Sequence, residues 1–218
     1  MRVLLPNIVC AFSLTVAVLD AADPDAAQLD IAKTLAEAAK HQDDFELRER
    51  LATQCTKFPE TFSSIILTEA DPTKRWMAVY AIRMSAQNKC DKALVAVFNN
   101  HKEAQDLRMQ IVMCLGESPE LAKDGLLPFL PGLHLLLKER PRRSDLERVI
   151  ELAGFLGDRS SVSLLTPLLD DKEVHSYTVE KDGKKIPNTI SKTAHEALQN
   201  ITGKRDIPAD RSAWEAIK

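Results

Sequence analysis

The sequence has few aromatic residues and few glycines. Aromatic side chains make up 5% of the 218 residues, and the chain contains 7 glycines. Because strands favour aromatic and β-branched residues, this composition argues against an all-β fold. Hydrophobic residues nevertheless make up 44% of the chain, which suits one domain or one short array of repeats.

The sequence also lacks the short motifs of several functional classes. It has no HExxH zinc motif, no CxxC pair, no glycine-rich phosphate loop and no nucleophile elbow. The formal net charge of -3 argues against a general nucleic-acid binder. We therefore predict that the protein is not an enzyme, with no catalytic residues, no metal site, no cofactor and no nucleic-acid partner.

The first 22 residues have the pattern of a secretory signal peptide. Arg2 provides the charged start, the apolar run from Ile8 to Leu19 has 12 residues, and Ala21 and Ala22 suit cleavage. An uncleaved membrane anchor is the alternative, but a membrane span needs about 20 apolar residues. We therefore expect an exported protein, periplasmic or extracellular, with no stable membrane span once residues 1–22 are removed.

Export leaves three cysteines, Cys55, Cys90 and Cys114. An oxidising compartment favours disulfides, but an odd number leaves at least one thiol unpaired or intermolecular. All three lie in helical patterns among apolar residues, so we expect small buried side chains. If a bridge forms, Cys90 and Cys114 are its expected partners.

The clearest structural pattern is a helical hairpin from Leu146 to Asp171. Its first helix repeats apolar residues at helical spacing, namely Leu146, Val149, Ile150, Ala153 and Leu156. Gly157 suits a left-handed turn, and Asp158 can cap a second helix with apolar residues Val162, Leu164, Leu165, Leu168 and Leu169. One hairpin cannot bury both of its faces, so the pattern predicts neighbouring hairpins of the same kind.

Glycine turns mark such neighbours along the chain. The spacing is 41 residues from Gly116 to Gly157 and 46 from Gly157 to Gly203, within the helical-repeat range of about 40–47. Further helices are predicted upstream, over Pro24–Lys40 and after the capping or initiating residues Asp44, Pro59, Pro72 and Asp91. Pro128 and Pro131 predict a kink, or two short helices, in the segment before Leu146.

The segment from Val174 to Pro187 interrupts the helical pattern. It places Asp182-Gly183 between β-prone residues, which is a strong signal for a β-hairpin. The predicted fold class is therefore all-α, a short α-solenoid of antiparallel helix hairpins, with a small β-hairpin insertion near 174–187.

Two turns and the end of the chain carry a family resemblance. The Leu115-Gly116-Glu117 and Leu156-Gly157-Asp158 turns, with Thr202-Gly203 followed by Asp210 and Trp214, resemble bacterial HEAT repeats, including the phycobilisome-lyase-type HEAT-like group. The resemblance covers about residues 71–218, and it departs from the repeat pattern at Ile190-Ser191, where the usual Val-Arg start is missing. It implies an α-solenoid and, as is common among such proteins, a scaffold that binds another protein.

These patterns divide the chain into a signal peptide (1–22), N-terminal helices (23–70) and a HEAT-like α-solenoid (71–218) with a closing segment (203–218). The main functional hypothesis is a non-catalytic scaffold that binds another protein. A lyase-like or other enzyme that uses the solenoid groove and a structural subunit of an envelope complex are the alternatives. Trp214 is expected to cap the core of the last hairpin, and Trp76 is expected to pack between units.

Basic residues gather in two stretches that interrupt the repeats. Arg140, Arg142 and Arg143 precede the central hairpin, and Lys181, Lys184 and Lys185 lie on the predicted β-hairpin. Because loops on rigid scaffolds often carry function, the hypothesis is that the six residues form one patch for an acidic partner or an anionic surface. The alternative is that they are solvated charges that keep these loops soluble.

Overall fold

The computed structural model describes residues 24–85, 91–116, 123–180 and 183–216, and every structural statement below concerns these residues. The predicted signal peptide, Cys90, Glu117 and Lys181 lie outside them. The described chain is mostly helical and contains one small two-stranded sheet, so the predicted combination of helices with a β-hairpin is confirmed.

The elements follow one another as antiparallel helices with one strand pair near the C-terminal end. The helices are α1 (Pro24–Lys40), α2 (Phe45–Lys57), α3 (Pro59–Thr68), α4 (Pro72–Ser85), α5 (Asp91–Phe98), α6 (Gln105–Gly116), α7 (Lys123–Leu126), α8 (Leu130–Glu139), α9 (Arg143–Leu156), α10 (Val162–Leu165), α11 (Ile190–Thr202) and α12 (Arg211–Glu215). Short 3₁₀ helices are η2 (Leu127–Phe129), η3 (Arg159–Ser161) and η4 (Thr166–Asp170), and the strands are β1 (Val174–Val179) and β2 (Lys185–Thr189).

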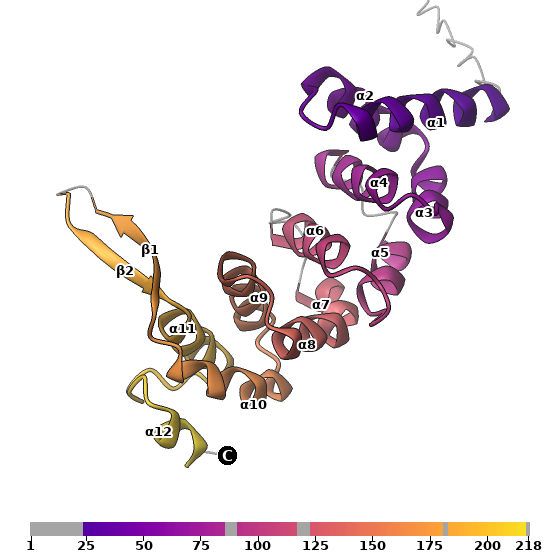
Figure 1. Ribbon diagram of the computed structural model, residues 1–218. Coiled ribbons are helices and arrows are strands. Elements are labelled where there is room, and N and C mark those ends of the chain that lie inside the picture. The colour runs from indigo at the N-terminus through magenta and orange to yellow at the C-terminus, as the bar shows by residue number, and fades with distance from the viewer. Residues whose placement is uncertain (1–23, 86–90, 117–122, 181–182, 217–218) are drawn as a thin grey trace, which may run out of the picture.

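The helices form two rows that curve together (Figure 1). The inner row consists of α2, α4, α6, α9 and α11, each packed against the next. The outer row runs through α3, α5, α8 and η4 on the other side of the arch, and α1 packs on α2 and α4 at one end. Successive inner helices therefore present one continuous concave surface, and the β-hairpin projects beyond it at the α11 end.

Local sequence signals set where the helices begin and end. The Asp44 carboxylate accepts a hydrogen bond from the Leu47 amide at 3.1 Å, and Asp158 caps η3 in the same way through Ser160. Gly157 and Gly203 end α9 and α11 with φ angles of 68° and 73°, the left-handed region that a side chain disfavours. The predicted turns at these two glycines are confirmed.

Proline breaks the outer helices into short pieces. Pro128 and Pro131 fall where α7 gives way to η2 and then to α8, as the sequence predicts. The expectation of a continuous second helix after Gly157 is wrong, because α10 ends at Leu165 and the chain continues as the 3₁₀ helix η4. Pro167 lies at the start of η4, and a proline there removes an amide donor that a continuing α-helix needs.

One hydrophobic core runs the length of both rows, from α1 to α12. Trp214 is 1% exposed, its indole nitrogen donates to the Pro208 carbonyl at 3.0 Å, and its ring meets His195 edge-on. This is the closing role expected for Trp214. Cys55 and Cys114 are buried as expected, whereas the Cys90–Cys114 bridge stays a prediction because Cys90 lies outside the described residues.

Glycine allows two helix pairs to approach closely. A Cβ atom on Gly154 would lie 2.8 Å from the Ala197 Cα, so α9 and α11 touch backbone to backbone. A Cβ atom on Gly132 would lie 2.6 Å from the Phe98 carbonyl oxygen, where α8 meets α5. At both contacts, the space between the helices is too small for a side chain.

A similar ion pair links each of three inner helices, α4, α6 and α9, to the end of an outer helix or to the segment after it. Arg75 in α4 pairs with Glu103, Arg108 in α6 with Glu139 at the end of α8, and Arg143 in α9 with Glu173 after η4. The Arg75 Nη1 to Glu103 Oε1 distance is 3.1 Å, and Arg108 Nη2 lies 2.6 Å from Glu139. The same device thus recurs in three consecutive helix pairs.

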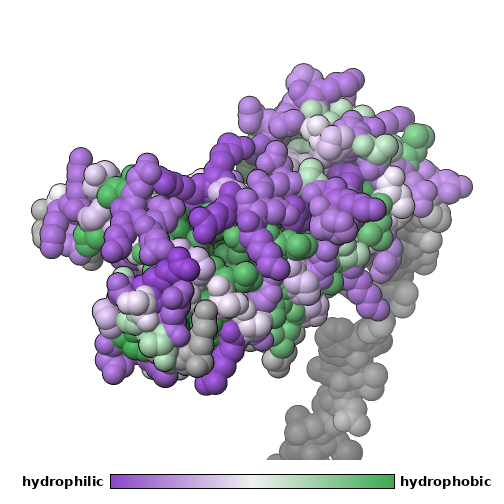
Figure 2. Space-filling model, turned by 60° about the horizontal axis from the view of Figure 1, so that its bottom comes forward, coloured by the Kyte–Doolittle hydropathy of each residue, from purple (hydrophilic) through white to green (hydrophobic). Residues whose placement is uncertain are grey.

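The β-hairpin has two different faces. Asn188 on β2 donates to the hydroxyls of Ser176 (3.1 Å) and Thr178 (3.0 Å) across the antiparallel pair. The opposite face carries Tyr177 and Val179, which are 59% and 61% exposed. Elsewhere exposed hydrophobic residues are dispersed, and Figure 2 shows them interrupted by hydrophilic residues over the face that it presents.

Candidate functional site

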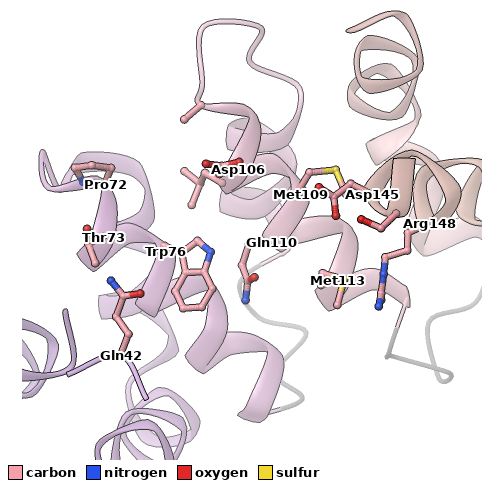
Figure 3. A pocket seen from close by; sticks show the side chains of 13 residues that line it. Gln42, Pro72, Thr73, Trp76, Asp106, Met109, Gln110, Met113, Asp145 and Arg148 are labelled. Atoms are coloured by element: carbon pink, nitrogen blue, oxygen red, sulfur yellow. The ribbon is translucent and has the colours of Figure 1, made fainter. Parts of the chain in front are cut away.

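A groove of about 670 Å³ opens on the inner row between α4, α6 and α9 (Figure 3). Helix α4 contributes Thr73 and Trp76, and α9 contributes Asp145 and Arg148. Helix α6 lies between them and contributes both charged and apolar residues, among them Asp106, Met109, Gln110 and Met113. The groove thus spans three successive inner helices, and it exists because they are packed side by side.

Trp76 forms the aromatic wall of the groove. Its ring stacks on Tyr80 one turn further along α4, with a centroid distance of 5.8 Å and an interplanar angle of 16°. The Arg48 guanidinium from α2 lies over the other aromatic ring, 4.9 Å from the Tyr80 centroid. Trp76 is partly buried against the core and also presents its ring to the groove between α4 and α6.

Gln110 is a buried amide without an acceptor. Its residue is 6% exposed, and its Nε2 has no hydrogen-bond partner among the described residues. An unsatisfied buried polar group costs about 1–3 kcal/mol relative to a satisfied one. Figure 3 shows the amide and the Trp76 indole between α4 and α6, so the donor is directed into the groove.

The charged residues of the groove are likewise unpaired. Asp106, Asp145 and Arg148 all line it, and none of the three forms an ion pair with any residue that the structure describes. This differs from Arg75, Arg108 and the other arginines of the repeated pairs on the same helices. The groove therefore combines an apolar wall, an unsatisfied amide and three unpaired charges.

Carboxylates continue along the inner face from α9 to α11. Burial is the main cause that raises the pKa of Glu151; the neighbouring Glu147 and Glu196 carboxylates raise it further, and the charge of Arg148 lowers it. The Thr193 hydroxyl of α11 lies 3.3 Å from the Glu147 carboxylate and holds this one of the three carboxylates in place. The inner face thus becomes more acidic beyond the groove.

The two basic stretches lie at opposite ends of the β-hairpin. Arg143 is held by Asp171 at 3.4 Å and by Glu173 at 2.6 Å, just before β1 begins. The hydrogen bond from Arg143 is the main cause that lowers the pKa of Glu173. Lys184 and Lys185 lie at the far end of the hairpin, where Lys185 is paired with Val179.

The remaining members of the proposed patch add little to this arrangement. Arg140 and Arg142 are exposed, and Arg140 adopts a positive φ of 51° at the end of α8. Lys181 lies outside the described residues. The structure therefore does not bring the described members into one cluster, and the six-residue patch stays a prediction.

A histidine–serine contact elsewhere is part of the packing. His134 Nε2 on α8 lies 3.0 Å from the Ser161 hydroxyl, and burial is the main cause that lowers the pKa of His134. Ser161 is fully buried, with 0% exposure. A nucleophile needs access to its substrate, so this pair serves to join α8 to η3.

Sequence reasoning did not single out the groove. Gln110 lies three positions after Leu107, beside Ile111 and four positions before Cys114, so a polar residue stands within an apolar stripe of the helix. That interruption was a readable signal, because an amide at a core position needs a partner. The contributions of Asp106 and Asp145 could not be found in this way, since exposed acidic residues are ordinary in a first helical turn.

Two features of other protein classes are absent from the described residues. These residues contain no group of three or more histidine, cysteine, aspartate or glutamate side chains placed to hold a metal ion. In the same part of the chain, no helix has the length and apolar character required to cross a membrane. No protein-family model matches the sequence, and no curated protein matches it.

Proposed function

We propose that the protein is an exported, non-catalytic α-solenoid of HEAT-like repeats that binds another protein through the groove on its inner row. One observation carries the proposal most directly. Arg75, Arg108 and Arg143 lie outside the groove and form ion pairs, whereas Asp106, Asp145 and Arg148 form none within the described chain, and Gln110 Nε2 has no hydrogen-bond partner there.

The repeated architecture supports the scaffold role. Arg75, Arg108 and Arg143 make the same kind of link in three consecutive helix pairs, as expected when each unit contacts mainly its neighbours. Such an array holds the inner helices in a fixed spacing, and a curved row of helices offers a long surface to a partner. The export component of the proposal rests on the signal-peptide pattern of residues 1–22.

Affinity capture from the native envelope fraction, followed by mass spectrometry, tests this function. The wild-type protein is compared with a groove variant, Trp76→Ala with Asp145→Lys, and with a patch variant, Lys184→Glu with Lys185→Glu. We expect the wild type and the patch variant to recover the same partner and the groove variant to lose it. Loss in the patch variant alone would instead place the interaction on the basic residues of the hairpin.

The enzyme alternative has a separate readout. A lyase-like relative would carry or transfer a chromophore, which absorbs visible light. We expect the protein purified from its native source to show no absorbance at wavelengths longer than those absorbed by its aromatic residues. A visible band that co-purifies with the wild type and disappears in the groove variant would favour the lyase-like alternative.

A further inference from the structure

We infer that the groove between α4, α6 and α9 holds an extended peptide segment of the partner, in which a basic side chain and an apolar one stand two residues apart on the same face of the segment. This inference rests on the proposed function and specifies the chemistry of the partner. It follows from the Gln110 amide, the apolar wall and the distribution of unpaired charge.

The Gln110 amide favours an extended main chain over a helix. Gln110 is 6% exposed and its Nε2 donor is unsatisfied. A hydrogen-bond acceptor on a segment that enters the groove would satisfy it. In a helix, the main-chain carbonyls are already occupied by the hydrogen bonds of the helix itself. An extended segment keeps its carbonyls available, and one of them can accept from Gln110 Nε2.

The apolar wall provides the site for one side chain. Trp76, Met109 and Met113 line the groove from α4 and α6, and methionine adapts its shape to irregular partners. A residue of an extended chain occupies about 150 Å³, from a rise of about 3.3 Å and spacings of about 4.7 and 10 Å. The groove volume of about 670 Å³ thus accommodates roughly four such residues.

The unpaired charges select a basic side chain. Asp106 and Asp145 each lie in the first turn of their helix, and Figure 3 shows both toward one rim of the groove. The Arg148 guanidinium lies toward the other rim, one turn further along α9. Two carboxylates at one rim attract a lysine or arginine there, and Arg148 repels a second basic residue at the opposite rim.

The same charges give the bound segment a direction. When a basic residue lies at the Asp106–Asp145 rim, the next side chain on the same face of the extended segment comes two residues later, about 6–7 Å further along. Trp76, Met109 and Met113 line the same groove and provide the apolar surface for that side chain. An acidic residue or a chain-terminal carboxylate therefore suits the Arg148 end.

The tryptophan content of the chain provides a direct binding readout. The sequence contains 2 tryptophans, and Trp214 is 1% exposed at the far end of the molecule. In Trp214→Phe, fluorescence reports on Trp76 alone and hence on occupancy of the groove. Isothermal titration calorimetry of the wild type gives the same affinities without any substitution, in case Trp214→Phe unfolds the closing segment.

The probes are blocked hexapeptides of sequence Gly-Lys-Ser-Leu-Ser-Gly, in which lysine and leucine lie on the same face of an extended chain. The two comparison peptides have glutamate in place of lysine or serine in place of leucine. We expect the lysine–leucine peptide to bind about tenfold more tightly than either comparison peptide, and to shift the Trp76 emission. A helix-constrained peptide of the same composition should bind no better. Equal affinity for the acidic peptide, or tighter binding of the constrained helix, would overturn the inference.

Three variants connect this binding to the named residues. Gln110→Met keeps the side-chain volume and removes the donor, and Asp106→Asn with Asp145→Asn removes both rim charges; each should weaken the lysine–leucine peptide about tenfold. Glu46→Gln with Asp206→Asn removes two exposed carboxylates outside the groove and should change nothing. Unchanged affinity in Gln110→Met and in the double rim variant would show that the peptide does not use the groove.

The outcomes separate this inference from the function on which it rests. If the groove variant Trp76→Ala with Asp145→Lys loses its native partner while none of the peptides binds, the scaffold function stands and the peptide inference is wrong. If the peptides bind as expected while that variant keeps its native partner, the peptide specificity stands and the proposed use of the groove for capture is wrong.

Discussion

Charged residues are paired at the outer margin of the inner helices, which carries Arg75, Arg108 and Arg143, and unpaired on the concave face of the same helices. At the margin, Arg75, Arg108 and Arg143 each reach a carboxylate of the following segment. On the concave face of the same helices, Asp106, Asp145 and Arg148 have no ion-pair partner within the described chain. Both regions are built from the same helices, so neither helix propensity nor overall composition accounts for the difference.

The difference assigns stability to one region and recognition to the other. Arg75 and Arg108 are mostly buried, and a buried charge is tolerated only when it is paired, so these two pairs help to fix the spacing between successive units. The charged groups in the groove form no ion pair between helices, and a buried unsatisfied donor such as Gln110 Nε2 opposes folding. Four changes, from the largest expected effect to the smallest, test this contrast.

Loss of a margin carboxylate should cause the largest destabilisation. Arg108 is 2% exposed, and its Nε and Nη1 have no partner among the described residues, so Glu139 is the carboxylate on which it depends. In Glu139→Ala the free energy of unfolding should fall by about 3 kcal/mol, because a buried guanidinium is left without its counterion. Glu37→Ala, at an exposed position of α1, is the matched control, and chemical denaturation measures both. A change in Glu139→Ala no greater than in the control would remove the stabilising role of the pair.

Overfilling the α5–α8 contact should have the next largest effect. The added methyl group of Gly132→Ala meets the Phe98 ring and carbonyl oxygen, which should cost about 2 kcal/mol. Gly116→Ala is the control, because a Cβ atom there has nothing within 4 Å among the described residues. The comparison of thermal unfolding in the two variants isolates the close approach from the change of residue type.

Removal of the groove amide should stabilise the protein. Gln110→Met replaces an unsatisfied buried donor by an apolar side chain of similar size, and the free energy of unfolding should rise by about 1 kcal/mol. This change in the free energy of unfolding has the opposite sign to that of Glu139→Ala, so the two variants together test the contrast between the two regions most directly. Destabilisation by Gln110→Met would show that the amide serves the fold and not a ligand.

The smallest effect concerns acid sensitivity. Burial lowers the pKa of His134 in the folded protein below its unfolded value of about 6.5, so the unfolded chain binds the proton more readily. The contribution of His134 to stability is therefore complete above about pH 6.5 and is lost as the pH falls toward the folded pKa. His134→Gln, which can still reach Ser161, should lose less stability than the wild type between about pH 7 and pH 5. Parallel pH profiles for the two proteins would contradict this.

Much of the helical organisation could be read from the sequence. The glycine turns at Gly157 and Gly203, the caps Asp44 and Asp158, and the β-hairpin around Gly183 lie where their residue types predict. These features depend on local backbone energetics, which a short stretch of sequence contains in full. Pro167 was the exception, because a proline so close to a helix start is compatible with both α and 3₁₀ geometry.

The groove could not be predicted, because it depends on which faces of distant helices meet. Trp76, Gln110 and Arg148 belong to three helices, and no sequence spacing places them around one space. The basic stretches also depend on the tertiary structure, because Arg143 pairs with Glu173 just before β1, whereas Lys185 pairs with Val179 at the other end of the two strands.

The sequence by itself determined the helices, their ends, and the one place where the helical pattern gives way to strands, because hydrogen bonding and backbone sterics act within a few residues. Only the tertiary structure decided which charges would find partners. Arg108 and Asp106 stand two positions apart on α6, yet one reaches Glu139 and the other faces the open groove. Side chains two residues apart point about 200° away from each other on a helix, so the neighbouring helices alone settle the role of each.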